Sequence, residues 1–295
     1  MSVAMWYALE QGYWIALILT VPTAGLLLRF FIIQHDCGHG SFFRSRFAND
    51  MLGRAVSLLT LTPYTNWRRA HATHHATSGN LAKRGTGDIH TLTVREFKAL
   101  SRGKQRMYRL YRNPFVLQFL GPPYLFLLSY RIPFGAPVPF REAWPGVLML
   151  NAGLIVFYGL LGAAMGWLNL LLIFGPVVLM SAWAGGWLFF IQHQFPDTDW
   201  DDGSNWDFHS AAIRGSSYYV LPKILQWFTG NIGLHHIHHL NGKIPNYRLQ
   251  ECLDASPELK GMSRLTFIES LKCVRLALWD EDSRKLVSFR QAAAT

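Results

Sequence analysis

Three long apolar segments restrict the fold of this chain more than any other feature. Residues 12–34, 145–166 and 169–192 are each long enough to cross a bilayer, which takes about 20 apolar residues. Lipid offers the backbone no hydrogen-bond partners, so such a segment crosses it as a helix. The turn between the second and third segments, residues 166–169, carries no charge, which fits the non-cytoplasmic face. We therefore predict an all-α integral membrane protein.

Composition and charge agree with a membrane location. Half of the 295 residues are hydrophobic and 16% are charged, against about 25% charged in soluble domains. Residues 41–113 hold fourteen lysines and arginines but three acids, which places this segment on the cytoplasmic side. Nucleic-acid binding is the alternative explanation of so basic a segment, but the apolar segments beside it favour a membrane surface. The three cysteines form no paired framework, so we expect reduced thiols.

Eight of the twelve histidines fall into three short clusters, with His236, which lies inside the third cluster, set aside. Residues three and four positions apart share one face of a helix, so each cluster directs its imidazoles to one place. Imidazole is a good ligand for zinc, copper, iron and nickel, and eight imidazoles exceed the needs of one ion. We therefore predict a site for two metal ions. The predicted ligands are His35, His39, His71, His74, His75, His235, His238 and His239.

One metal site requires all three clusters to lie on the same side of the membrane. The chain between His39 and His71 is too short for two crossings, so we expect residues 49–63 along the interface or in a cytoplasmic cap. The hairpin of the last two apolar segments already supplies two crossings, which return the chain to the side of the first two clusters. Residues 114–130 therefore cannot add a crossing, and we expect them to be interfacial or re-entrant.

The rest of the chain shows no internal repeat and no flexible linker. We expect one domain over residues 1–295, with the chain after Gln194 soluble and cytoplasmic. The acidic loop after Pro196 is interpreted as a solvated turn or a helix-capping region rather than a metal site. A signal peptide is not expected, because no basic region precedes the first apolar segment.

The chemistry open to such a site follows from its ligands. Carboxylate-bridged diiron sites use glutamates and Glu-x-x-His pairs, and this chain has no such glutamate pairs. Two ions held by neutral imidazoles stay strongly charged and can bind O2, and beside a bilayer the available substrate is a hydrocarbon chain. Zinc binds the same ligands but has no redox chemistry. We therefore expect iron that activates O2 and attacks an unactivated C–H bond.

Four motifs carry a resemblance to a known family. They are HDCGHGSFF at residues 35–43, WRRAHATHHATSGN at 67–80, IQHQF at 191–195 and GNIGLHHIHHLNGKIPNYRL at 230–249. The chain resembles the membrane fatty acid desaturases, most closely the bacterial and cyanobacterial acyl-lipid type, over nearly its whole length. The resemblance implies a mushroom-shaped helical fold whose cytoplasmic cap holds two irons. It also implies a ninth histidine ligand just after the last span, where this chain has His193.

The chain departs from that family in two places. Members generally have a complete extra span before the one that leads into the first cluster, and residues 1–11 resemble its truncated remnant. In the animal acyl-CoA desaturases an asparagine four residues before the extra histidine holds one iron through water. Phe189 stands there in this chain, so that role is not transferred; Asn231, four residues before His235, is a weak substitute.

Several other residues have two readings. His236 lies off the ligand face of its cluster, and His90 and His209 are isolated, so we expect none of these histidines to bind metal. Cys37 is read as a small packing residue. Two acids, Asp36 and Asp88, hydrogen-bond the outer nitrogens of metal ligands or are solvated, and the sequence does not decide between these alternatives. No residue can be selected for substrate binding, although Trp200, Trp206 and Trp227 are candidates.

The expected function is that of an acyl-lipid desaturase in the cytoplasmic membrane, with its site facing the cytosol. It would place a double bond in an acyl chain esterified in membrane lipid, using O2 and two electrons, without an acid or base besides the metal ligands. The chain has no haem-attachment motif, no flavin or nicotinamide fingerprint and too few cysteines for an iron–sulfur cluster. An external donor is therefore needed, and a small acidic ferredoxin fits the basic segment.

Two other functions stay open. A hydroxylase or carotenoid oxygenase on the same scaffold would carry the same clusters, which do not determine whether a second hydrogen is removed or oxygen is added. A divalent-metal transporter would place ligands along a path through the membrane, whereas these clusters flank the apolar segments.

Overall fold

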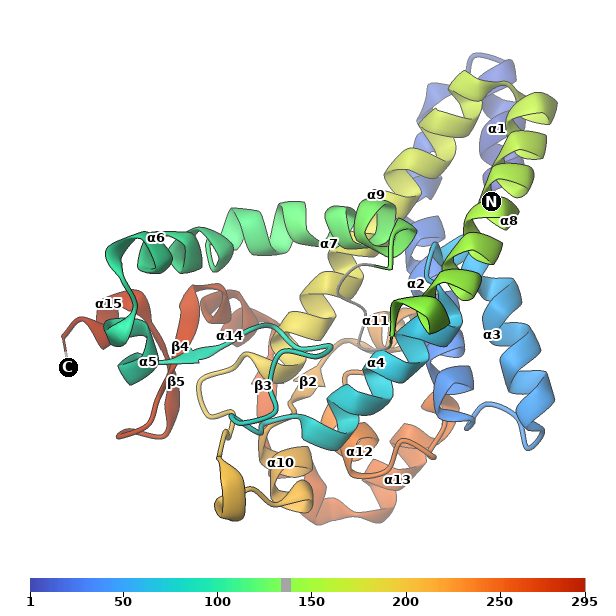
Figure 1. The fold of residues 1–295 in the computed structure, drawn as a ribbon. Helices are drawn as coiled ribbons and strands as arrows, with labels where there is room; N and C mark the ends of the chain where they lie inside the picture. The colour runs from blue at the N-terminus through green and yellow to red at the C-terminus, as the bar shows by residue number, and fades with distance from the viewer. Residues whose placement is uncertain (134–138, 295) are drawn as a thin grey trace. The chain divides into compact units, whose positions relative to one another are not determined.

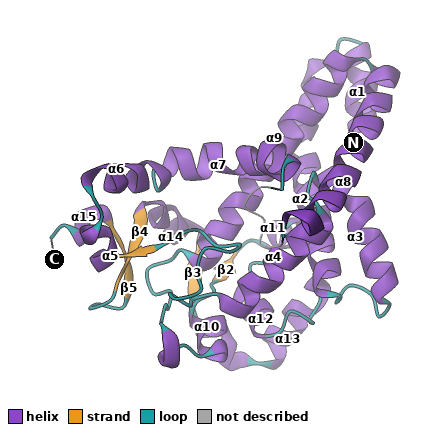
Figure 2. Ribbon diagram, in the orientation of Figure 1, coloured by secondary structure: helices purple, strands orange, loops and turns teal. Residues whose placement is uncertain are grey.

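The computed structural model describes residues 1–133 and 139–294, which form two compact units (Figures 1 and 2). The first, which we name the membrane unit, contains residues 1–69, 122–185 and 227–230. The second, the histidine unit, contains residues 70–121, 186–226 and 231 onward. Of the described helices, four start in one unit and end in the other, namely α4 (Tyr64–Thr77), α7 (Gly121–Pro123), α9 (Trp167–His193) and α11 (Lys223–Phe228).

Long helices dominate the membrane unit. Within the described residues, three helical stretches are long and apolar enough to cross a membrane, namely Trp14–His39, Phe140–Met165 and Trp167–His193. The first runs five residues beyond the expected end at Gln34, so its last turns carry the first histidine cluster. Besides α9, the elements are α1 (Ser2–Glu10), η1 (Trp14–Leu19), α2 (Thr20–His39), α3 (Arg46–Thr60), α7 (Gly121–Pro123), η3 (Tyr124–Leu128), η4 (Ser129–Arg131) and α8 (Phe140–Met165).

The membrane unit has an apolar core and a buried polar clamp. Figure 1 shows α1, α2, α8 and the start of α9 gathered together, and Met5, Ala24 and Ile173 lie in the core between them. Between α2 and α3, Gln34 is fully buried: its amide nitrogen donates to Ser57 Oγ at 3.0 Å, and its oxygen accepts from Thr60 Oγ1 at 2.6 Å. A buried amide left without partners would cost about 1–3 kcal/mol, so these hydrogen bonds favour one register of the two helices.

Short elements build the histidine unit around two small apolar cores. One core is formed by Leu234, Ile237, Leu249, Leu253 and Leu259, and the other by Val94, Phe97, Tyr108, Ala277, Leu278 and Ala292. The helical elements are α5 (Val94–Ala99), α6 (Arg102–Tyr111), η2 (Phe115–Leu120), η5 (Gly203–Asn205), α10 (Phe208–Arg214), α12 (His235–Leu240), η6 (Asn246–Arg248), α13 (Leu249–Ala255), η7 (Pro257–Gly261), α14 (Phe267–Lys272), η8 (Cys273–Arg275) and α15 (Phe289–Ala292).

Two small sheets lie in the histidine unit, where the sequence analysis predicted no strand (Figure 2). In one, β1 (Leu92–Thr93) pairs parallel with β4 (Leu276–Asp280), which pairs antiparallel with β5 (Lys285–Ser288). In the other, β2 (Tyr218–Val220) pairs parallel with β3 (Arg264–Thr266). All five residues of β4 are buried, so the strand lacks the alternation that reveals a half-exposed strand. The mainly helical fold is confirmed, with these strands as the exception.

Candidate metal centre

Three elements of the histidine unit carry seven of the nine predicted ligands. His71, His74 and His75 lie on α4, His193 is the last residue of α9, and α12 carries His235, His238 and His239. On α12, Ile237 packs into the apolar core. His235, His238 and His239 are spaced three and four residues apart and therefore share one face of the helix, which is the ligand face. The end of α9 is held by Gln192, whose side chain donates to the Ile232 carbonyl at 3.0 Å.

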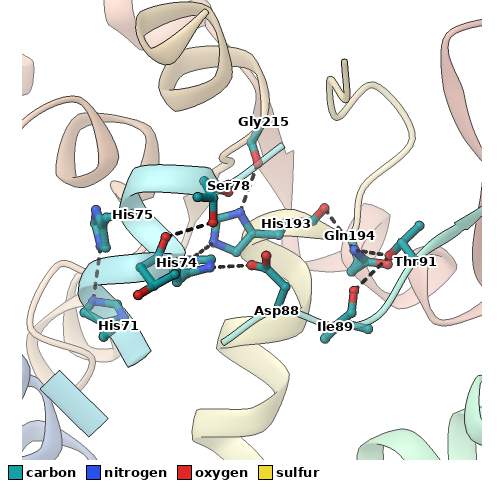
Figure 3. A network of polar contacts seen from close by, with 12 residues as sticks. His71, His74, His75, Ser78, Asp88, Ile89, Thr91, His193, Gln194 and Gly215 are labelled. Carbon is teal, nitrogen blue, oxygen red and sulfur yellow. Dashed lines mark hydrogen bonds and ion pairs between the residues drawn. The ribbon is translucent and has the colours of Figure 1, made fainter. Parts of the chain in front are cut away.

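Four of these histidines form one enclosed group. His74, His193, His235 and His239 are all buried, and one ring nitrogen of each lies within 4.8 Å of the other three. An imidazole nitrogen binds a metal at about 2.0–2.1 Å, so nitrogens around one ion lie roughly 3–4 Å apart. The spacing of the enclosed group is therefore close to that of a single metal ion, and Figure 3 shows His74 and His193 facing each other.

Hydrogen bonds at the outer nitrogens show where the lone pairs point. His193 Nδ1 lies 3.0 Å from the Gly215 carbonyl oxygen, and His74 Nδ1 contacts the Asp88 carboxylate. Both partners accept, so in the neutral rings Nδ1 carries the hydrogen and Nε2 carries the lone pair. The two Nε2 atoms are 3.1 Å apart, and His193 Nε2 is also 3.1 Å from His235 Nε2. Facing lone pairs repel each other unless a cation lies between them, so this arrangement fits a metal ion.

His239 supports the same conclusion. Its Nε2 atom is buried and has no hydrogen-bond partner within the described part of the chain. Burial, together with the surrounding imidazoles of His75, His235, His193 and His74, holds the pKa of His239 well below the ordinary value of 6.5. The ring therefore stays neutral at physiological pH, which is the form that binds metal.

A second group in the same unit is more open. His75 Nε2 lies 3.1 Å from His71 Nε2 and 3.0 Å from His238 Nε2. His71 and His75 are partly exposed and His238 is buried. The remaining two predicted ligands, His35 and His39, lie at the end of α2 in the membrane unit, where their ring centroids are 4.8 Å apart.

Both acids that the sequence left undecided hydrogen-bond a predicted ligand. The Asp88 contact with His74 was described above, and Asp36 Oδ1 lies 3.2 Å from His35 Nδ1. The Asp36 side chain is 2% exposed and that of Asp88 is 7% exposed, so neither is solvated. Such a carboxylate fixes the tautomer and the orientation of the ring and raises its basicity as a ligand.

A small cavity lies beside the enclosed group. It measures about 10 Å³, and its lining includes Asp88, Phe189, His193 and Trp200, which is about the room that one water molecule requires. Asp88 Oδ2 and Trp200 Nε1 are both buried without a hydrogen-bond partner among the described residues. Phe189 packs its ring against His74 and His193, with centroids 5.6 and 5.8 Å apart.

Arg112 was not predicted as a residue of this site, because in the sequence it is only one of many positive charges. Its side chain is buried, and it donates to Gln194 Oε1 at 2.6 Å and to the Leu276 carbonyl at 2.9 Å. Gln194 in turn donates to Thr91 Oγ1 at 3.3 Å (Figure 3). This chain of hydrogen bonds holds the residue that directly follows His193. Only burial separates Arg112 from its exposed neighbours, and burial is not visible in the sequence.

The other histidines and the acidic loop have structural roles. His236 Nε2 lies 3.1 Å from the Leu259 carbonyl, and burial lowers the pKa of His236 to about 4. His236, His90 and His209 belong to neither histidine group in the described residues. In the acidic loop, the side chain of Asp207 accepts a hydrogen bond from Ser210 N and caps α10. Helix capping was one of the two roles expected for this loop. Two other acids, Asp199 and Asp201, pair with Arg284.

Two further candidates have structural explanations. Asn231, considered as a substitute for the family's asparagine, has φ 56° and donates its side-chain amide to the Asn246 carbonyl at 3.2 Å. Cys37 is 1% exposed, which agrees with a packing role, and all three cysteines are free.

Comparison with known proteins gives one consistent result. Residues 12–270 match the family model described as fatty acid desaturase. The chain is 46% identical to a fatty acid desaturase of Bacillus subtilis (strain 168), over 96% of this chain and 80% of that protein. It is 29% identical to an sn-1 acyl-lipid omega-3 desaturase (ferredoxin) of Nostoc sp. (strain 36), over 85% of this chain and 68% of that protein. It is 23% identical to an sn-1 oleoyl-lipid 12-desaturase of Anabaena variabilis, over 85% of this chain and 69% of that protein.

Proposed function

Because this chain belongs to the fatty acid desaturase family, whose members are oxidoreductases, we propose that it desaturates a fatty acyl chain esterified in membrane lipid, using O2 and a pair of irons. The observation that carries the proposal is the enclosed group, where the Nε2 lone pairs of His74 and His193 face each other at 3.1 Å. Such a group fits a bound cation, and relatives of this chain are named acyl-lipid omega-3 desaturase and oleoyl-lipid 12-desaturase.

The proposed ligand set has nine histidines. His74, His193, His235 and His239 would hold one iron, and His71, His75 and His238 would be ligands of the other, while His35 and His39 complete the set that the resemblance implies. When bound, the irons would supply the activation of O2 and the removal of hydrogen from unactivated C–H bonds. Overall, two hydrogens leave adjacent CH2 groups, and O2 takes them up with two electrons and two protons to form two waters and the double bond.

The surrounding residues prepare the ligands for this role. Asp88 and the Gly215 carbonyl keep a hydrogen on the Nδ1 atoms of His74 and His193, so that Nε2 is available to metal. Phe189 covers these rings with an apolar face and limits the access of water. Neutral ligands would leave the positive charge of a bound pair of irons uncompensated.

The product analysis tests this function. The chain is expressed in a host that lacks its own desaturase, and fatty acid methyl esters are profiled with mapping of the double-bond position. New monounsaturated or polyunsaturated chains are expected. Hydroxylated chains or oxidised carotenoids in their place would assign a hydroxylase or oxygenase, and metal uptake without any lipid product would favour a transporter.

Two neighbouring histidines provide a matched pair of variants. His235→Gln removes a proposed ligand, so iron content and product should both fall. His236→Gln removes a buried histidine that belongs to neither group and keeps an amide to contact the Leu259 carbonyl. Its iron content and product should stay near those of the unmodified protein. Equal loss in both variants would contradict the assignment of the third cluster.

The proposed electron donor is an acidic ferredoxin that docks on a basic, cytosol-facing surface of this cytoplasmic-membrane protein. The name of the Nostoc relative includes ferredoxin, and the basic segment gives charge complementarity. Arg68, Arg69 and Arg84 are already paired with Asp50, Glu142 and Glu96, so exposed Lys83 is the cleaner position to test.

Reversal of this charge, Lys83→Glu, should slow turnover with ferredoxin and weaken its dependence on salt, while iron content stays the same. The turnover of Lys83→Gln with ferredoxin should lie between that of the unmodified protein and that of Lys83→Glu. Turnover with an unchanged salt dependence in both variants would remove Lys83 from the docking surface.

A further inference from the structure

The last turn of α2, which carries the first histidine cluster, is held by a tyrosine from the start of α4. A helix ends with four carbonyl groups that have no partner inside the helix. One of them in α2, the Cys37 carbonyl, accepts from Gly40 N at 3.0 Å and from the Tyr64 hydroxyl at 2.8 Å. Cys37 lies between the predicted ligands His35 and His39 in the sequence. The Tyr64 hydroxyl therefore fixes the helical turn on which both imidazoles stand.

Tyr64 is placed so that it stays a hydrogen-bond donor. The residue is 3% exposed, and its ring packs so closely on α3 that a Cβ atom on Gly53 would overlap it. Burial and the nearby Asp50 carboxylate raise the pKa of Tyr64 above its ordinary value of 10. The hydroxyl therefore keeps its hydrogen at physiological pH.

Asp50 and Arg68 determine where that hydrogen goes. A tyrosine hydroxyl has one hydrogen, and two acceptors lie near it, the Cys37 carbonyl at 2.8 Å and Asp50 Oδ1 at 3.1 Å. Arg68 Nη1 donates to the same Oδ1 atom at 2.6 Å. Because the arginine compensates the charge of the carboxylate, the hydrogen of Tyr64 is left for the shorter contact, which is the one to the carbonyl.

The first turn of α4 also restrains one of the two imidazoles. The ring centroid of Trp67, three residues after Tyr64, lies 5.8 Å from that of His35. A Cβ atom on Gly38 would lie 2.9 Å from the Trp67 ring, so only glycine lets the indole come this close. All of these residues belong to the membrane unit. The backbone and one ring of the first cluster are thus held by contacts within that unit.

We propose that Tyr64, supported by Asp50 and Arg68, is a positioning residue that holds His35 and His39 ready for metal. A loose helix end would have to be ordered when metal binds, and that ordering would lower the affinity. This role rests on the proposed function, because it takes both histidines to be ligands, and it assigns three residues to the site that carry no imidazole.

Binding of Co(II) to the full-length protein in detergent, in competition with a chelator, tests the role of Tyr64. Tyr64→Phe removes the hydroxyl and keeps the ring. Loss of an outer contact of a metal ligand typically costs about 10–100-fold in metal affinity. Since Tyr64 acts through the helix backbone, we expect a loss of about tenfold, at the lower end of that range, for one of the two ions. The visible absorption of bound Co(II), which depends on the arrangement of its ligands, should change as well.

Tyr108→Phe is the matched control. Tyr108 is also buried, and its hydroxyl also donates to a backbone carbonyl at 2.8 Å, that of Ala277. It lies in an apolar core of the histidine unit. Thermal unfolding should show a similar loss of stability in Tyr64→Phe and Tyr108→Phe, whereas only Tyr64→Phe should weaken the binding of Co(II) and change its absorption.

A pair of variants at Arg68 tests the same network without touching the buried ring. The Arg68 side chain is 27% exposed, so its replacement should be tolerated even where Tyr64→Phe does not fold. Arg68→Gln leaves Asp50 uncompensated and draws the hydroxyl hydrogen away from the Cys37 carbonyl, so Co(II) should bind more weakly. Arg68→Lys keeps the charge and should restore most of the affinity.

Three outcomes would overturn the positioning role. They are unchanged Co(II) affinity in both Tyr64→Phe and Arg68→Gln, an equal loss of affinity in Tyr64→Phe and Tyr108→Phe, and an unmodified protein that binds no Co(II). Lipid analysis of the unmodified chain separates this role from the proposed reaction. Weaker Co(II) binding in Tyr64→Phe without any desaturated product would contradict the reaction alone. Desaturated product together with normal Co(II) binding in the variants would contradict the network alone.

Discussion

The two histidine groups differ in burial and in the number of imidazoles that the histidine unit supplies. The enclosed group has four histidines in this unit, and every one of them is buried. The open group has three histidines in this unit, and two of them are partly exposed. Within this unit the enclosed group therefore offers a buried set of four imidazoles, whereas the open group offers three that water can reach more easily.

The largest effect should come from removal of a ligand in the enclosed group. His239→Ala removes a buried nitrogen without a hydrogen-bond partner in the described residues, so we expect metal affinity to fall by more than about 100-fold, beyond the effect of outer contacts. Desaturated product should then be undetectable. Iron measured per chain by mass spectrometry checks this result.

His71→Ala provides the comparison for the open group. Because His71 is partly exposed, water can replace the lost ligand, and we expect more iron to remain than in His239→Ala. If both variants retained equal iron, the distinction between the enclosed and the open group would be wrong.

A smaller effect should follow from loss of the carboxylate beside His74. Asp88→Asn keeps the size of the side chain but removes the charge that supports Nδ1–H of His74, and loss of such a contact typically costs about 10–100-fold in metal affinity. Titration with a competing chelator measures the change. Asp36→Asn is the matched variant for the membrane unit, where the carboxylate lies 3.2 Å from His35 Nδ1.

The Arg112 network should affect stability more than metal chemistry. Arg112→Leu leaves Gln194 Oε1 and the Leu276 carbonyl without their donor, which we expect to cost about 1–3 kcal/mol for each unsatisfied buried group. Thermal unfolding in detergent gives the loss. Arg112→Lys should recover part of it by supplying one donor, and a stability unchanged by both substitutions would contradict the role of Arg112.

The smallest change should come from Trp200→Phe beside the cavity. The substitution removes the indole N–H that lines the cavity and keeps most of the apolar ring. Trp200 Nε1 has no protein partner among the described residues, so at most one hydrogen bond to a water in the cavity, worth about 0.5–1.5 kcal/mol, is lost. We therefore expect at most a small decrease in thermal stability and little change in iron content. A loss of iron comparable to that of Asp88→Asn would mean that Trp200 supports the ligands more directly.

The sequence was most informative where a physical pattern repeats along the chain. Apolar length revealed the spans, and the spacing of three and four residues identified histidines that α4 and α12 bring together in the histidine unit. It was least informative where distant segments meet. The β1–β4 pair joins residues 92–93 to 278–279, and Arg112 reaches residues 194 and 276; neither contact leaves a local pattern.

Two predicted ligands stand at the ends of apolar spans, and this has a consequence for the enzyme's response to its surroundings. The span Trp14–His39 ends at His39, and the span Trp167–His193 ends at His193. Each helix rises about 1.5 Å and turns about 100° per residue, so one residue inserted into either span would displace its terminal imidazole and rotate it away. Hydrophobic mismatch, which tilts spans to suit a thicker or thinner bilayer, acts on the same two side chains. We therefore expect a change in membrane thickness to shift these two imidazoles and, with them, the proposed coordination of iron.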